Sequence, residues 1–145
     1  MNRLDNTVIT EADLDGFAKS LALSEGRIIY VGIVDSSCKL KYCNFREDAK
    51  LHLDEEVIRN LMPITSSMVV APLEKLVPIL GKMSTVLVRY ENRVLIFIRL
   101  KNYSIIVGLD PDVPTPFPEY IAGLVNNAVK RTLANQEFDP FQNNE

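Results

Sequence analysis

The chain has 145 residues, of which 47% are hydrophobic and 24% are charged, a balance that fits one globular domain. Its formal net charge is -3 at pH 7, whereas a general nucleic-acid binder would carry a basic face. No apolar run reaches the roughly 18 residues that span a bilayer, and the N-terminus lacks the apolar stretch of a secretory signal. We therefore expect a cytoplasmic protein with no nucleic-acid partner and no membrane insertion.

The pattern of apolar, turn and capping residues predicts eight elements and two terminal segments. An N-terminal arm (1–9) and a C-terminal tail (135–145) flank a single domain at 10–134. The predicted elements in chain order are a helix after Thr10, strands over 27–34 and 38–45, a helical region over 54–81, three strands within 83–110, and a helix from Pro118 to 134.

The second strand, 38–45, is predicted to lie at an edge of the sheet. Leu40 and Tyr42 alternate with Lys39 and Lys41 in the sequence, which places the first pair on one face and the lysines on the other. Outward lysines discourage pairing with another chain.

The two cysteines, Cys38 and Cys43, lie five positions apart in this strand, so we expect their side chains on opposite faces. Such thiols do not form a disulfide without distortion. With His52, the only histidine, they lack the paired short spacing of a zinc site. The sequence predicts reduced thiols and neither a metal nor another cofactor.

The middle helical region begins with three acidic residues, 54–56, at its positive end. Pro63 interrupts its apolar pattern, so we expect a kinked helix or two abutting pieces. The apolar stripe consists of Val57, Leu61, Ile64 and Met68. The methionines of this region, Met62, Met68 and Met83, either fill the core or form an adaptable interaction surface.

The three strands within 83–110 are joined by polar turns at 91–92 and 101–102. Their β-branched and aromatic residues occupy both alternation phases, which indicates a sheet covered on two faces. Helix, two strands, helical region, three strands and helix together predict an α+β fold with a five-stranded antiparallel sheet. The polar tail that follows contains Phe138 and Phe141, which would either dock on a partner or fold back.

Motifs of catalysis and nucleotide binding are not found in the sequence. The glycines lack phosphate-loop spacing, and Gly32 and Gly108 fall inside strands, where a close helix approach or a bulge explains them. His52 is not tied by a motif to a serine or cysteine nucleophile. We therefore predict no catalytic residue and a protein that is not an enzyme.

Two segments carry a family resemblance: 29–35 leading into a turn, and 84–110 leading into the last helix. Over 10–134 they resemble the roadblock domain, in particular small stand-alone archaeal proteins of this type; longin and profilin domains share much of the topology. The resemblance implies strand order 2-1-5-4-3, with the first and last helices on one face and the middle helix on the other. It also implies a homodimer paired through its third strands, and a platform for small GTPases or signalling proteins.

The implied dimer is consistent with how the two edges of the predicted sheet differ. The third strand carries a single internal charge, while the second carries Lys39 and Lys41. The predicted interface consists of Thr85, Val86, Leu87, Val88, Arg89 and Tyr90. The alternative is that the middle helical region covers this strand.

A rival interpretation is a ligand sensor of the PAS type. The segment 31–35, its polar turn and 40–44 also resemble the opening hairpin of such sensors. A cavity between sheet and helices would then be lined by Tyr42, Phe97 and Tyr103. Aromatic packing in the core is the alternative role for these three residues.

Overall fold

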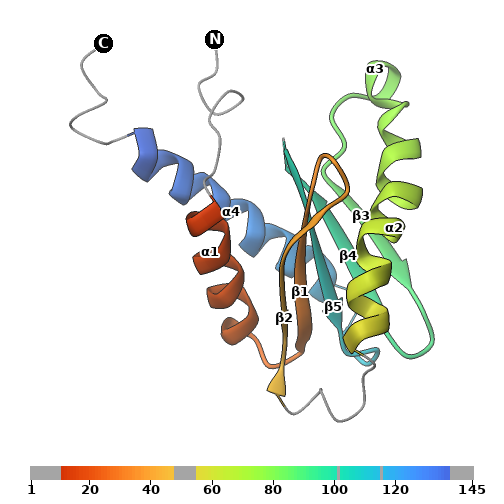
Figure 1. Cartoon of the computed structure of the whole chain (residues 1–145), viewed down its shortest axis with the longest axis vertical. Helices are drawn as coiled ribbons and strands as arrows, with labels where there is room; N and C mark the ends of the chain where they lie inside the picture. Colours follow the sequence, from red (N-terminus) through yellow and green to blue (C-terminus); the bar gives the residue numbers. More distant parts are fainter. Residues whose placement is uncertain (1–10, 48–54, 101, 115, 138–145) are drawn as a thin grey trace.

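The structure is a computed structural model that describes residues 11–47, 55–100, 102–114 and 116–137 (Figure 1). Its elements are α1 (Glu11–Ser24), β1 (Ile28–Asp35), β2 (Leu40–Phe45), α2 (Glu55–Glu74), α3 (Val77–Leu80), β3 (Thr85–Arg89), β4 (Val94–Arg99), β5 (Tyr103–Leu109) and α4 (Phe117–Glu137). The predicted arm at 1–9, His52 and the tail phenylalanines lie outside the described residues. Helix α4 runs to Glu137, past the predicted domain end at 134.

The five strands form one antiparallel sheet in the order β2-β1-β5-β4-β3, which confirms the predicted fold class and strand order. Helices α1 and α4 lie on one face of the sheet and α2 lies on the other (Figure 1). Helix α1 contacts β1 and β2, α4 contacts β4, and α2 contacts β1, β2 and β4. Both faces of the central strands are therefore covered, as their two-sided apolar pattern predicts.

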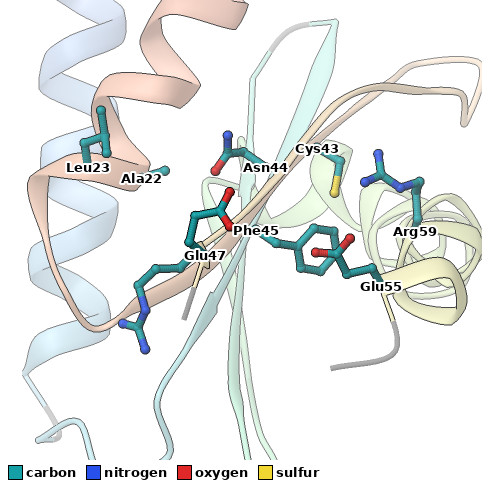
Figure 2. Close-up of a pocket in the computed structure, with 9 residues that line it drawn as sticks. Ala22, Leu23, Cys43, Asn44, Phe45, Glu47, Glu55 and Arg59 are labelled. Carbon is teal, nitrogen blue, oxygen red and sulfur yellow. The ribbon is translucent and has the colours of Figure 1, made fainter. Parts of the chain in front are cut away.

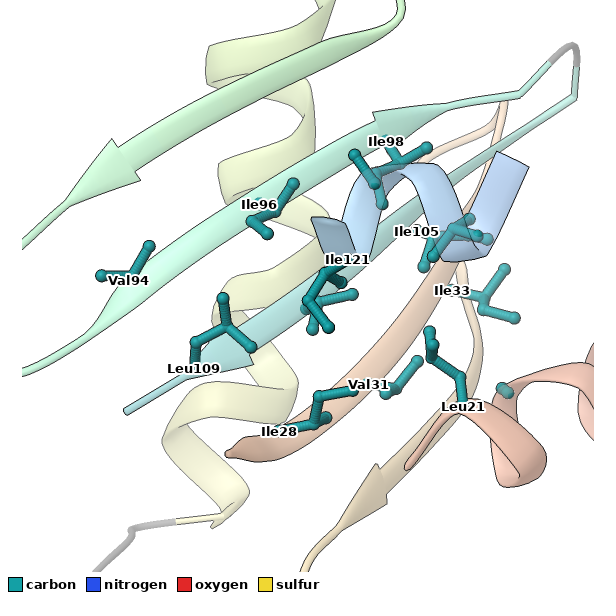
Figure 3. Packing of buried hydrophobic residues seen from close by; sticks show 14 of the residues in the cluster. Leu21, Ile28, Val31, Ile33, Val94, Ile96, Ile98, Ile105, Leu109 and Ile121 are labelled. Carbon is teal, nitrogen blue, oxygen red and sulfur yellow. The ribbon is translucent and has the colours of Figure 1, made fainter. Parts of the chain in front are cut away.

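One core lies between the sheet and the α1/α4 layer (Figure 3). Alternate residues of β1, β4 and β5 point into it because side chains alternate between faces along a strand. Its largest fully buried side chains include Ile33, Ile96, Ile98, Ile105, Leu109 and Ile121.

A second core lies between the sheet and α2, built from the other alternation phase of the same strands. It consists of Ile29, Tyr30, Val34, Phe45, Met62, Val70, Phe97 and Ile106, with partly buried neighbours that include Val86 and Val88 of β3. We call it the α2-side core.

Two strand glycines create space for large side chains of the α2-side core. A Cβ atom at Gly32 would collide with the thioether of Met62 on α2, which confirms the expected close helix approach. The ring of Tyr30 on β1 lies against Gly108. A Cβ atom at position 108 would be only 2.5 Å from the nearest atoms of that ring. Both glycines are therefore explained by packing.

The β1–β2 pairing contains an irregularity that corrects one prediction. The register shifts between Ile33 and Val34, so Ile33 pairs with Tyr42 while Val34 pairs with Leu40. Leu40 consequently packs against the α2-side core and Tyr42 against the α1/α4 side. The expectation that both lie on one face is wrong, because a bulge breaks the two-residue period.

The cysteines also differ from the prediction. Cys38 lies in the turn before β2, with a φ of 60°, rather than in the strand. The Asp35 carboxylate organises this turn by accepting hydrogen bonds from the backbone N–H groups of Ser37 (2.8 Å) and Lys39 (3.0 Å). Cys38 and Cys43 therefore pack against the same core instead of opposite faces, and both are free thiols.

Helix α2 is continuous through Pro63 and ends at Glu74, after a second internal proline, Pro72. Each proline removes a backbone donor, so the local sequence alone does not favour an unbroken helix here. Burial of Met62, Ser66 and Val70 against the sheet supports the helix across both sites. None of the described helices is long and apolar enough to cross a membrane.

Candidate functional site

Strand β3 forms one edge of the sheet and pairs only with β4 within the described residues. The Arg99 N–H donates to the Ser84 carbonyl (2.8 Å), and the Tyr90 N–H donates to the Arg93 carbonyl (2.7 Å). Backbone groups of alternate residues in an edge strand point to opposite sides, so the even-numbered residues face β4. The N–H and C=O groups of Thr85, Leu87 and Arg89 therefore face outward.

The side chains of the predicted interface divide between the two faces of the sheet. Val86 and Val88 are partly buried against the α2-side core. Leu87 pairs with Ile96 on the α1/α4 side of the sheet and is 43% exposed. Tyr90 lies just beyond β3 and is 56% exposed. The contact surface offered by β3 is thus its backbone, with Leu87 and Tyr90 beside it.

The opposite edge of the sheet, β2, carries one of the two predicted lysines. Lys41 lies in β2 with its ammonium group 3.8 Å from the Asp35 carboxylate, and Lys39 is exposed in the preceding turn. Charged side chains of this kind discourage edge-to-edge pairing. Of the two predicted lysines, only Lys41 therefore lies within the edge strand, and the prediction for Lys39 is wrong because β2 begins at Leu40.

Helix α2 carries the predicted apolar stripe on a face that the sheet does not cover. The exposed fractions are 47% for Val57, 48% for Leu61, 52% for Ile64 and 71% for Met68. The face that packs on the sheet is formed instead by Ile58, Met62, Val69 and Val70. An exposed stripe of this length on one helix is typical of an interaction surface.

The exposed stripe lies toward the β3 edge of the sheet. Arg59 on one flank of α2 lies over the Phe45 ring of β2, 5.6 Å from its centroid. On the other flank, Leu61 lines a groove together with Tyr90, at the end of β3. The apolar flank of α2 and the residue that follows β3, Tyr90, therefore meet at this groove.

That groove, which we call the α2–β3 groove, has a volume of about 220 Å³. It lies between α2 and the β3–β4 end of the sheet and is lined by Ile58, Leu61, Thr65, Tyr90, Arg93 and Phe97, among others. Tyr30 contributes to its inner wall, and burial raises the pKa of this phenol to about 12. The groove therefore offers an apolar interior with Arg93 as a cation.

A second cavity, of about 420 Å³, lies at the β2 edge between the end of α1 and the start of α2 (Figure 2). Glu55 and Arg59 project from α2 toward Cys43 and Phe45 of β2. Burial raises the pKa of the Cys43 thiol to about 11, so the thiol is protonated near neutral pH. A protonated thiol is a poor nucleophile, and this cavity therefore lacks an activated cysteine.

The three residues proposed for a sensor pocket do not come together. Tyr42 and Tyr103 pack against the α1/α4 side of the sheet, whereas Phe97 belongs to the α2-side core. The sheet itself separates them, because the β2 register and the β4 alternation place their side chains on different faces. Of the three, Phe97 lines the α2–β3 groove.

The sequence predicts the β3 segment as a contact surface, but it does not indicate which face of α2 stays exposed. The stripe was recognised by its helical spacing, yet spacing alone gives no sign that a helix has a second apolar face. The three methionines of this region differ in burial. Met62 is buried in the core, Met83 is partly buried, and Met68 is exposed. Met62 thus follows the core alternative, whereas Met68 lies outside the core and its role as an interaction surface stays a prediction.

The fold is that of roadblock/LC7 domain proteins. A roadblock/LC7 domain from Streptomyces avermitilis has a TM-score of 0.62 at 13% identity, covering 84% of this chain and 98% of that one. Myxococcus xanthus MglB has a TM-score of 0.65 at 12% identity, covering 89% and 96% respectively. An MglB with a tetrameric arrangement has a TM-score of 0.60 at 11% identity, covering 84% and 88%. No family model and no curated protein sequence matches this chain.

Proposed function

We propose that this protein is a non-enzymatic regulatory scaffold that works as a homodimer. The proposal rests on two features of the described residues, the outward backbone of β3 and the exposed apolar flank of α2, which meet where Leu61 and Tyr90 line one groove. An unpaired edge strand offers backbone hydrogen bonds, and an adjoining apolar patch offers burial. Together they match what a strand-paired interface requires.

Two copies would pair their β3 strands antiparallel about Leu87, whose N–H and C=O both face outward. Such pairing is two-fold symmetric and closed, so it would stop at a dimer rather than grow into fibres. The sheet would continue across both subunits, and the apolar flanks of the two α2 helices would meet above the seam. The tetrameric arrangement of a structurally similar MglB supports self-association in this fold.

The dimer is proposed to recruit a small GTPase or another signalling protein. This partner class comes from the resemblance to roadblock domains, whose members supply a binding surface to such proteins. Burial keeps the Cys43 thiol protonated near neutral pH, which makes this one cysteine a poor nucleophile.

The proposed dimer is tested by placing a proline at the outward-facing position of the edge. Leu87→Pro removes an N–H that points away from β4, and an edge strand tolerates proline at such a position. We expect the wild-type chain to be a dimer by multi-angle light scattering and Leu87→Pro to be a monomer with an unchanged circular dichroism spectrum.

The matched control is Val88→Pro, one residue along the strand. The N–H of Val88 faces β4, so this substitution removes a bond of the sheet itself and should lower thermal stability. Lysine at Val86 or Val88 is a less suitable probe, because both side chains pack against the α2-side core. A monomeric wild-type chain, or a Leu87→Pro variant that stays dimeric, would contradict pairing through β3.

Recruitment of a GTPase is tested by titrating the dimer and the Leu87→Pro monomer against small GTPases loaded with GDP or a GTP analogue, with calorimetry as the readout. The proposal expects binding that depends on the nucleotide and on the dimer. Binding to neither form would exclude the GTPase while leaving the dimer unaffected.

A further inference from the structure

The α2–β3 groove is open in a single copy of the chain, and its mouth adjoins the proposed dimer surface. Leu61 and Tyr90 line the groove and are also about half exposed. Leu61 therefore connects the groove with the exposed stripe of α2. A side chain that reached this surface from a second copy would find an unfilled apolar space beside the seam.

The relative direction of α2 and β3 determines which part of a second copy reaches the groove. At one end, Ile58 near the start of α2 lines the groove with Tyr90, which follows β3. At the other end, Glu74 is the last residue of α2, and its carboxylate pairs with the Arg99 guanidinium. The backbone N–H of Arg99 donates to the carbonyl of Ser84, just before β3. Helix α2 and strand β3 thus run in opposite directions.

Antiparallel pairing of β3 about Leu87 reverses the second copy end for end. The groove lies near the start of α2, so the two-fold axis brings the second half of the other α2 beside it. We propose that Met68 of the second copy enters the α2–β3 groove and closes it, an inference that rests on the proposed dimer. Each subunit would contribute one groove and one methionine.

The exposure and chemistry of Met68 favour it as the occupant. It lies in the second half of the exposed stripe and is the stripe's most exposed residue, at 71%. Its unbranched thioether chain adapts to irregular apolar spaces and packs well beside aromatic rings such as those of Tyr90 and Phe97. Burying it would also remove the largest exposed apolar side chain of the stripe from water.

The assignment is tested by disulfide trapping between two differently tagged chains. Both carry Cys38→Asn and Cys43→Ala, so that the only thiols are those introduced. One chain also carries Met68→Cys and the other Tyr90→Cys. We expect the mixture to form a cross-linked species of mixed mass under mild oxidation. The control pairs Met68→Cys with Leu23→Cys, an exposed position on α1, and should give no such species.

The possible results separate the two proposals. A dimer by light scattering with no cross-link between the Met68→Cys and Tyr90→Cys chains would overturn the groove assignment and leave the dimer intact. A monomeric protein would overturn both. Equal cross-linking in the Leu23→Cys control would also count against the assignment, since it would reflect random collision.

A second measurement keeps the native cysteines. Met68→Ala should raise the dimer dissociation constant by about tenfold, as expected for a side chain buried at an interface. Ser67→Ala, at the exposed neighbouring position, should leave it unchanged. Sedimentation equilibrium gives both constants, and an equal effect of the two substitutions would reject the role of Met68.

Discussion

Tyr30 shows how a single residue connects the sheet, the α2-side core and the groove. Its ring lies over Gly108 and packs 5.4 Å from the Phe45 ring, centroid to centroid. Burial is the main cause that raises the pKa of its phenol from 10.0 to about 12, and Arg93 partly offsets it. The folded protein therefore holds this proton at a pH where the unfolded chain releases it.

The free energy of unfolding should consequently fall as pH rises from about 10 to about 12. A pKa raised in the folded state stabilises the protein fully below the unfolded value, and this stabilisation is lost as pH approaches the folded value. The shift of the Tyr30 pKa between the unfolded and the folded chain corresponds to a change of roughly 2 to 3 kcal/mol in the free energy of unfolding. Urea titrations of wild type and Tyr30→Phe at pH 9 and pH 11.5 would measure it.

Burial also raises the pKa of Cys43 to about 11, so titration of this thiol lowers the free energy of unfolding over the same pH range. The comparison with Tyr30→Phe separates the contribution of the Tyr30 phenol from that of Cys43. The variant should lose less stability than the wild type between the two pH values. Parallel losses in both proteins would show that Tyr30 does not cause the alkaline dependence.

At the scale of elements, α2 is the part of the fold that sequence periodicity describes least completely. The predicted stripe from Val57 to Met68 is apolar and helical, yet it is the exposed face. A second face, with Met62 and Val70, packs on the sheet. Periodicity could not choose between them, because the choice depends on where the helix docks.

The end of α2 is attached to the sheet by an ion pair. Arg99 Nε donates to Glu74 Oε1 at 2.7 Å, and Arg99 Nη1 donates to the Tyr103 carbonyl at 3.0 Å. Both side chains are about one-quarter to one-third exposed. This contact fixes the second half of α2, which includes Met68, relative to β4.

Glu74→Gln should lower the free energy of unfolding by about 1 kcal/mol, since it weakens a charge-assisted hydrogen bond in a partly buried site. Backbone amides in the last turns of α2 should also exchange faster, as measured by hydrogen exchange with mass spectrometry. Asp15→Asn is the matched control: its pair with Lys19 is 3.3 Å long and solvent-exposed, and its loss should cost less than about 0.5 kcal/mol. Similar costs for the two variants would argue against an anchoring role for Glu74.

In the whole molecule, the fold covers both faces of the central strands and, among the described residues, leaves an apolar surface exposed at the β3 side. That surface combines the β3 edge, Leu87, Tyr90 and the α2 stripe. In the proposed dimer, association removes it from water, so folding and association become thermodynamically linked.

The melting temperature should therefore rise with protein concentration. A ligand or subunit that binds only the folded state stabilises it by mass action, and a tenfold increase in concentration adds up to about 1.4 kcal/mol per association step. Differential scanning calorimetry over a hundredfold concentration range would measure the effect. Leu87→Pro should lose the dependence, and a wild-type melting temperature independent of concentration would be inconsistent with a dimer.

The number and kind of most elements can be predicted from the sequence, because local periodicity and turn residues encode them. The run 83–110 predicted three strands with both faces covered, and its alternation matches the two cores. The strand order came from the resemblance to a known fold and is confirmed. The predicted interface at Thr85–Tyr90 stays a prediction.

Features that depend on contacts between distant segments are visible in the folded chain alone. The bulge opposite Leu40 and Tyr42 depends on the β1–β2 register, and the outward direction of the Leu87 backbone depends on how β3 pairs with β4. Which face of α2 stays exposed depends on docking against the sheet. Local periodicity carries none of these, because register and docking are set by the free energy of packing many residues at once.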